Sequence, residues 1–440
     1  MNARNAKVVG ALLAVGAATP PSLAAAEHEL YRDDSRGTKL DLTLDLAAAW
    51  YGGKDSWFGH SEAFLGASTD TWADLGAAPG LTFETRAGKG TFFSNLSAVY
   101  TTTAGDDASG LTVGLDKKSE LTLELGNVGW KAEDLFDGLE GDTFTITVGR
   151  QNYNIGTGFL INDGAEDGGE RGGWYLAMRK AFTEAVVASL DSDKWLFEAF
   201  RLENHPRKGG PLGEAYGVNV EYKFGEEASL GTTYMGVESN VPGSVKLDVY
   251  SARASWRGES GFGVAGEYAD ETSSQISSRG YYGEVSYAFE NPSWSPVLSY
   301  RYAHFDGDNP ATPVDERFHE LAYGFTDWGS WYQGEITGEY ALGNGNLISS
   351  LLRVQLAPRE DLTLNAMLYK FTLDRPLSFG VLSKDWGDEL NFTAEWQVNE
   401  HMLVTGVLGA LFPGEAARQY VRAASADDWV HAMILVTYAW

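Results

Sequence analysis

Apolar and polar residues alternate strictly along most of the chain after about residue 38. The first such stretch is 40–50, where leucines, Ala48 and Trp50 take one face, and Asp41, Thr43 and Asp45 take the other. A two-residue period over about ten residues predicts a β-strand, and a tilted strand of that length can span a bilayer. The pattern therefore predicts strands that each have one apolar face.

We count 20 segments of this kind. They cover 39–51, 79–88, 90–102, 119–128, 142–150, 173–190, 194–203, 215–224, 228–238, 246–257, 260–269, 280–290, 295–305, 317–326, 331–342, 346–357, 361–373, 387–398, 401–412 and 429–440. The connections tend to alternate between short turns, such as 225–227, and long loops, such as 413–428. This asymmetry is typical of outer-membrane barrels. We therefore predict an all-β protein, a transmembrane antiparallel β-barrel within a range of 16 to 20 strands.

The last segment ends on an aromatic residue. Val430, Ala432, Ile434, Val436, Tyr438 and Trp440 fall on one face. A C-terminal aromatic strand resembles the signal by which outer-membrane barrels are recognised for assembly, so we expect Trp440 to engage the barrel-assembly machinery. Aromatic residues near other strand ends predict interfacial girdles. They are Trp50, Tyr51, Trp256, Trp294, Trp328, Trp331, Trp386 and Trp429.

The N-terminal residues have the pattern of an export signal. Arg4 and Lys7 precede an apolar stretch at 8–18, and two prolines lead to the small residues 24–26. We predict a cleavable signal peptide at 1–26, a short periplasmic segment at 27–38 and the barrel at 39–440. The expected location is the outer membrane of a Gram-negative bacterium, in contact with lipid and lipopolysaccharide.

Composition removes several classes of protein. The 33 basic and 61 acidic residues give a net charge of −28, which argues against nucleic-acid binding. The chain has no cysteine, so disulfide scaffolds and thiolate metal sites are excluded. No apolar run after residue 26 approaches the 18 residues of a spanning helix, which excludes a helical membrane protein.

If the apolar faces meet lipid, the opposite positions line the lumen. The expected pore-lining bases are Arg86, Arg179, Lys223, Arg253, Arg257, Arg301 and Arg353. The expected acids are Asp41, Asp45, Glu84, Glu124, Glu198, Glu221, Glu267, Glu284, Glu320, Glu335, Glu339 and Glu395. An ionisable side chain facing lipid costs a few kcal/mol, so these residues indicate water inside the barrel.

Charges of the two signs are partly segregated. Four of the arginines (253, 257, 301 and 353) lie in the second half, and Glu320, Glu335 and Glu339 are expected on strands between them. This arrangement fits a transverse field that orients solutes. It fits equally a ladder of cross-strand ion pairs, and the sequence leaves both open.

Three stretches resemble the alginate export family of outer-membrane barrels. The first carries Gly149, Arg150, Gln151, Gly156, Gly158 and Arg171, and the others are 318–340 and 408–414. The resemblance covers roughly 80–440 and implies about 18 strands that pass an anionic polysaccharide or small hydrophilic solutes. We expect the two surplus strands to lie in 173–190 or in the first hairpin.

One feature departs from this family. The expected lumen has 7 bases and 12 acids, and these acids repel a polyanion. We therefore expect a passive channel for hydrophilic solutes or saccharides, with no catalysis. A dedicated exporter of an anionic polysaccharide such as alginate is the first alternative, and an outer-membrane enzyme or structural barrel is the second.

No cofactor or metal site is expected. The seven histidines lack metal-ligand spacing. His304 and His319 could meet across a hairpin, but wall residues explain them better. The acidic loops 162–170 and 306–308 could bind Ca²⁺ through carboxylates, yet they match no complete EF-hand, which favours solvated loops.

Overall fold

The computed structural model describes residues 28–162, 164, 167–204, 213–238, 246–289, 293–324, 331 and 333–440. Its main feature is one antiparallel sheet whose strands pair in chain order. The strands of the first half are β1 His28–Asp33, β2 Thr38–Lys54, β3 Thr71–Ala87, β4 Gly90–Gly105, β5 Ser119–Glu133, β6 Thr143–Gln151, β7 Phe182–Asp191, β8 Trp195–Glu203 and β9 Glu214–Phe224. Those of the second half are β10 Ala228–Glu238, β11 Leu247–Arg257, β12 Phe262–Thr272, β13 Ser277–Ala288, β14 Val297–Phe305, β15 Leu347–Arg359, β16 Leu362–Leu373, β17 Asp385–Asn399, β18 Met402–Pro413 and β19 Trp429–Ala439.

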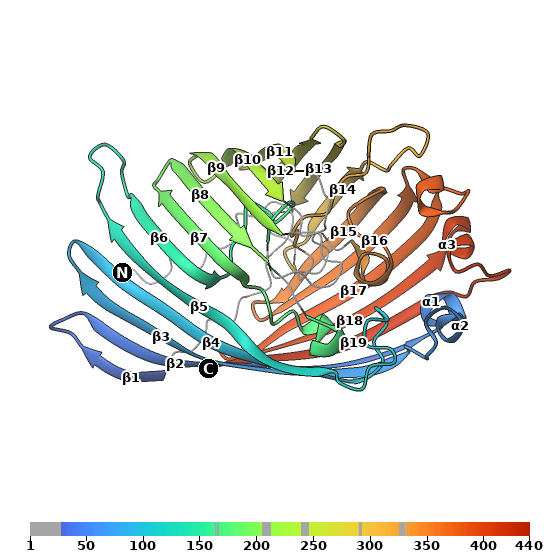
Figure 1. Ribbon diagram of the computed structural model, residues 1–440, viewed down its shortest axis with the longest axis horizontal. Coiled ribbons are helices and arrows are strands. Elements are labelled where there is room, and N and C mark those ends of the chain that lie inside the picture. The colour runs from blue at the N-terminus through green and yellow to red at the C-terminus, as the bar shows by residue number, and fades with distance from the viewer. Residues whose placement is uncertain are drawn as a thin grey trace.

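The sheet closes on itself where β19 pairs with β2, from Val430 opposite Lys54 to Ala439 opposite Asp45. Strands β2 to β19 thus form a closed barrel of 18 strands, which confirms the predicted fold class. In Figure 1, β2–β4 with β18–β19 and β8–β13 lie on opposite sides of the ring. β1 pairs with the start of β2, beyond the point where β19 ends, within the stretch expected to be a short periplasmic segment.

The count of 20 strands was wrong, and so was the expected place of the surplus. The first hairpin is present as β2 and β3, and 173–190 contains one strand that starts at Phe182. Two other predicted strands, 317–326 and 331–342, do not form in their described residues. Both belong to the connection 306–346 between β14 and β15, and the second contains a π-helical segment, η3, at Gly334–Ala341.

The outer face of the barrel is apolar, as the alternation predicted. Leu121, Leu230 and Ile434 are each at least half exposed among the described residues. The aromatic residues expected in the girdles differ in exposure. Trp50, Trp256 and Trp294 are exposed, whereas Tyr51, Trp331, Trp386 and Trp429 are almost fully buried. Trp328 lies outside the described residues.

Short helices gather at the rim that carries the long loops (Figure 1). They are α1 Ser56–Gly59, α2 Ser61–Leu65, α3 Glu415–Tyr420 and the 3₁₀ turn η4 Pro376–Phe379; η1 Gly169–Arg171 and η2 Trp174–Leu176 follow β6. Aromatic contacts hold the rim helices to the barrel and to one another: the rings of Trp57 on α1 and Trp429 on β19 lie 5.5 Å apart, and Phe379 stacks on Tyr420 at 4.9 Å. None of the helices in the described residues is long and apolar enough to cross a membrane.

Candidate functional site

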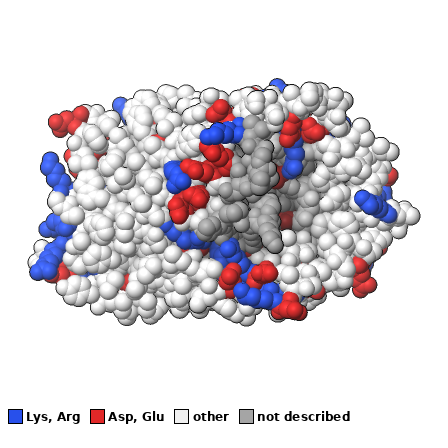
Figure 2. Space-filling view, in the orientation of Figure 1, with Lys and Arg blue, Asp and Glu red and all other residues white. Residues whose placement is uncertain are grey.

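Polar and charged side chains occupy the inward positions of the barrel strands. The acidic and arginine side chains that are nearly fully buried there are Asp41, Asp74, Glu124, Arg253, Glu267, Glu271, Glu284, Arg301, Arg353, Glu389 and Glu395. Their chain neighbours point outward: Tyr300 is 45% exposed beside Arg301, and Leu352 is 44% exposed beside Arg353. In Figure 2 the charged residues on the visible face gather largely around a central hollow, and broad areas beside it carry neither sign.

The strand register brings opposite charges together on the inner wall. Arg253 on β11 is directly opposite Glu267 on β12, and Glu284 on β13 is opposite Arg301 on β14. Arg253 also donates to Glu221, with Nη2 3.0 Å from Oε2. These neighbours favour the ladder of cross-strand ion pairs. Glu320, Glu335 and Glu339, which we expected on intervening strands, lie instead in the connection 306–346.

The connection between β6 and β7, residues 152–181, turns away from the wall at a bulge. Gly149 has a φ of +116°, and a Cβ there would lie 2.3 Å from the carbonyl oxygen of Gly126. Only glycine tolerates this conformation and this close approach. The register between β6 and β7 shifts between Gly149 and Gln151, and the pairing resumes for one position, Gln151 with Phe182. Gly149 in the Gly-Arg-Gln motif therefore has a structural role.

Buried charges fasten the end of segment 152–181 to β5. Arg179 is 1% exposed; its Nη1 lies 2.6 Å from Oδ1 of Asp167, and its Nη2 donates to the carbonyl oxygen of Glu120 at 2.9 Å. Oε1 of Glu124 accepts the backbone N–H groups of Lys180 and Ala181 at 2.8 and 2.9 Å. The segment is held by hydrogen bonds from a charged wall, which are stronger than neutral ones.

Segment 306–346 is fastened to the opposite part of the wall. The carboxylate of Glu389 on β17 accepts the N–H groups of Ile336 and Thr337, both at 2.8 Å. The side-chain oxygen of Asn391 accepts the N–H of Glu335 at 3.1 Å. The guanidinium of Arg301 lies 4.5 Å from the Trp331 ring centre, a cation–π contact.

The two segments meet inside the barrel. Ile161 and Ala322 form a parallel β-bridge, in which Asn162 N–H donates to Ala322 O at 2.6 Å. Tyr175 donates a hydrogen bond to Glu335. Phe159 packs on aromatic rings from both the wall and the other segment; they are Tyr282, Phe305, Phe318 and Trp331. The interior of the barrel is therefore narrowed by two joined segments.

A cavity of about 830 Å³ lies on the long-loop side of this junction. Segment 306–346 supplies Arg317, Glu320 and Asn346 to its lining, and the rim supplies Phe379 and Tyr420. Arg317 and Glu320 pair across the cavity wall, with Nη2 2.8 Å from Oε1. The cavity thus combines both signs of charge with aromatic side chains.

The predicted pore-lining residues fall into three groups. Those nearly buried are Arg179, Arg253, Arg301, Arg353, Asp41, Glu124, Glu267, Glu284, Glu335 and Glu395. Those of intermediate exposure are Lys223, Arg257, Glu198, Glu221, Glu320 and Glu339. Asp45, Glu84 and Arg86 are exposed. Lys223 lies near the short-turn rim, where Nζ pairs with Asp191 at 2.5 Å.

The residues of the family motif divide between two places: Gly149, Arg150 and Arg171 lie together near β5, whereas Gly156 and Gly158 have neighbours elsewhere. Arg150 donates from Nε to the carbonyl oxygen of Glu124 at 2.9 Å, and Arg171 pairs with Glu120 at 3.0 Å. Gln151 is buried. A Cβ on Gly156 would lie 2.8 Å from Nε of Arg253, and one on Gly158 3.0 Å from Cβ of Asn162. The two glycines therefore let segment 152–181 approach the wall and itself.

Several residues of this site were absent from the sequence prediction. Glu389 and Asn391 occupy inward positions of the strand 387–398, so the alternation alone could have identified them. Glu271 lies on β12 just beyond the end predicted for that strand. Asp167 lies in the acidic loop 162–170, where only its charge distinguished it. Tyr175 lies in the 3₁₀ turn η2, within the part of 173–190 that was wrongly predicted as strand.

The comparisons with known proteins agree with this architecture. The chain is similar to Pseudomonas aeruginosa OccK5 (OpdH), with 12% identity, a TM-score of 0.56 and coverage of 91% of this chain and 97% of the other. It is also similar to Acinetobacter baumannii OccAB1, with 11% identity, a TM-score of 0.57 and coverage of 95% and 99%. The fold is thus that of outer-membrane porin-type barrels.

The model of the family described as "Alginate export" matches residues 228–431, from β10 to β19. This match confirms the resemblance to the alginate export family at the stretches 318–340 and 408–414, whereas the first stretch, 149–171, lies outside the matched residues. A comparison with curated proteins finds no match.

Proposed function

We propose that the protein is a passive outer-membrane channel for hydrophilic solutes or saccharides. The observation that supports this most is the junction of segments 152–181 and 306–346 inside an 18-strand barrel. A barrel of this size is wide enough for an aqueous channel, and inward segments narrow it to the size of small solutes. The lumen has more acids than bases, so we expect it to favour neutral saccharides and cations over anions.

A second candidate is a dedicated exporter of an anionic polysaccharide. It is favoured by the position of two bases at the junction. Arg301 lies against Trp331, and Arg253 lies beside Gly156. A polyanion must pass the narrowest part of a channel, so bases there could outweigh acids elsewhere on the wall.

Conductance in planar bilayers separates these functions. For the proposed channel we expect conductance, and reversal potentials in a KCl gradient that indicate a preference for K⁺ over Cl⁻. Short uronate oligomers should not block this current. Anion preference, with block by uronates at micromolar concentration, would instead identify the exporter. A folded barrel without conductance contradicts both and leaves an enzyme or a structural barrel.

Export and assembly are part of the same proposal. Residues 1–26, the expected signal peptide, lie outside the described residues, and the mass of the protein isolated from outer membranes tests whether they are removed.

Trp440 exchanges two backbone hydrogen bonds with Leu44, at 2.6 and 2.9 Å, and stacks on His28. We expect Trp440→Ala to slow barrel assembly in cells, with accumulation of unfolded chain in the periplasm, whereas Trp294→Ala, which alters an exposed Trp at the short-turn rim, leaves the assembly rate unchanged.

A further inference from the structure

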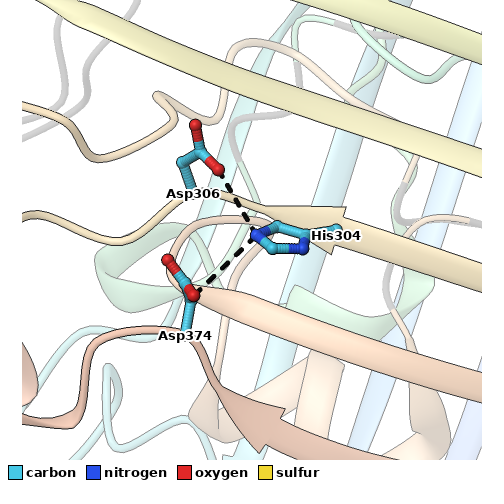
Figure 3. A group of neighbouring side chains, drawn as sticks. All are labelled: His304, Asp306 and Asp374. Atoms are coloured by element: carbon cyan, nitrogen blue, oxygen red, sulfur yellow. Dashed lines mark ion pairs between the residues drawn. The ribbon is translucent and has the colours of Figure 1, made fainter.

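A histidine and two aspartates converge at the long-loop rim, outside the lumen. Nε2 of His304 lies 3.3 Å from Oδ1 of Asp306 and 3.9 Å from Oδ1 of Asp374 (Figure 3). One ligand atom from each residue lies within 4.8 Å of the other two. His304 points to the outer side of β14, because its neighbours Ala303 and Phe305 are fully buried on the inner side.

The second oxygen of each carboxylate is held by the protein. Oδ2 of Asp306 accepts the backbone N–H and the Nε–H of Arg279, at 3.0 and 3.3 Å. Oδ2 of Asp374 accepts the N–H of Gly307 at 3.0 Å. Nδ1 of His304 lies 3.3 Å from the hydroxyl of Tyr281. These contacts orient one free oxygen of each aspartate and one ring nitrogen toward a common point, as outer contacts do around metal ligands.

His319 provides a contrast within the same segment. Its Nδ1 faces Glu271 and its Nε2 faces Asp315, each at 3.3 Å. Two carboxylates on opposite ring nitrogens are the partners of a protonated imidazole. At His304, by contrast, both carboxylates face a single nitrogen, which can donate only one proton.

We propose that His304, Asp306 and Asp374 bind one divalent transition metal ion, with Zn²⁺ as the reference ion. Ligand atoms bound to a tetrahedral Zn²⁺ at about 2.0–2.1 Å lie about 3.3 Å apart, close to the spacing found here. An imidazole ligand favours Zn²⁺ and related ions over Ca²⁺ and Mg²⁺. Three protein ligands leave a further position for water or an oxygen of a lipid headgroup.

The position of the site gives it a mechanical role. The carbonyl oxygen of Asp306 accepts the N–H groups of Phe318 and Asn346, and the N–H of Asp374 donates to the carbonyl oxygen of Asn346. Asp306 starts segment 306–346 and Asn346 ends it. A bound ion therefore ties the ends of β14 and β16 to both ends of the segment that narrows the barrel.

Metal binding by the full-length barrel in detergent, stripped with EDTA, tests the proposal. We expect the wild type to bind one Zn²⁺ in equilibrium dialysis, and Co²⁺ to give the visible absorption of a four-coordinate site. Asp374→Asn, which keeps the shape and the acceptor for Gly307, and His304→Asn should each lower the affinity by more than about 100-fold. Tyr281→Phe should lower it by roughly 10-fold, as loss of an outer contact does.

His319→Asn is the matched control and should leave binding unchanged. Heat-modifiable migration on gels verifies that each variant is a folded barrel. The proposal is overturned if the folded wild type binds no stoichiometric Zn²⁺, if Asp374→Asn binds as tightly as the wild type, or if His319→Asn abolishes binding. Because the site lies outside the lumen, these outcomes are independent of whether the barrel conducts.

Discussion

Arg179 and Asp167 form an ion pair that is almost completely removed from solvent, with Nη1 2.6 Å from Oδ1 and side chains 0% and 4% exposed. Both residues belong to segment 152–181, so the pair closes a loop within the segment, and the other nitrogens of Arg179 bind β5. An ion pair buried in this way is costly to break on one side only, since the remaining charge loses its partner.

We therefore expect Arg179→Met to destabilise the docked segment by about 3–5 kcal/mol. Hydrogen exchange in the peptide 167–181 should become faster, and the single-channel current should become noisier. Arg201→Met is the control, since Arg201 forms exposed pairs with Glu203 and Glu214, worth about 0–1 kcal/mol. Equal exchange in the two variants would contradict a specific role for the buried pair.

A second prediction concerns the junction of the inward segments. Parallel neighbours in a β-bridge lie about 4.8 Å apart, within the Cα range of a disulfide. In this cysteine-free chain, the double variant Ile161→Cys/Ala322→Cys should oxidise nearly completely without change in conductance. The single variant Ile161→Cys controls for the loss of the side chain. Failure to oxidise, or a conductance that rises when the disulfide is reduced, would mean that the segments separate in the conducting channel.

The third prediction is a pH dependence of segment 306–346. Burial alone would lower the pKa of His319, but its hydrogen bond and charge attraction to Glu271, together with Asp315, raise this pKa above its usual value. Because this pKa is higher in the folded state, the protonated His319 stabilises the docked segment. The stabilisation is complete below about pH 6.5 and is lost as the pH rises through the raised pKa. Nearby Arg317 opposes the protonation of His319 and limits the effect.

Hydrogen exchange in the peptide 316–322, corrected for intrinsic rates, measures this step. Protection should be higher at about pH 6 than at about pH 9. His319→Gln should remove the difference, whereas His401→Gln, at the opposite rim beside Glu400, should preserve it. A wild type with equal protection at both pH values would show that His319 does not stabilise the segment.

The fourth prediction concerns ion selectivity. Replacing Arg253, Arg301 and Arg353 by Gln should raise the K⁺/Cl⁻ permeability ratio by at least about twofold, because the lumen loses three positive charges. The outward-facing Arg201→Gln tests whether any charge change has the same effect. If the ratio does not change in a triple variant that still folds, these arginines lie away from the ion path.

The alternation of apolar and polar residues was sufficient to predict most strands of the barrel wall. β8 to β11 match their predicted ranges within about a residue, because lipid outside and polar groups inside select opposite side chains at alternate positions. The same rule failed at 331–342. Glu335 and Ile336 are adjacent and both nearly fully buried, so this stretch has no lipid-facing side. Alternation in sequence does not distinguish a strand of the wall from a segment enclosed by it.

The sequence by itself therefore determined that the chain forms a barrel and which face of most of its strands is apolar. Only the tertiary structure decided what fills the interior. The contacts of Arg179 with Asp167, of Glu389 with Ile336 and of Ile161 with Ala322 join residues from irregular loops to the wall or to each other. The alternation of apolar and polar residues reflects only the two environments on either side of a strand. These contacts depend instead on which distant segments meet after the barrel has closed.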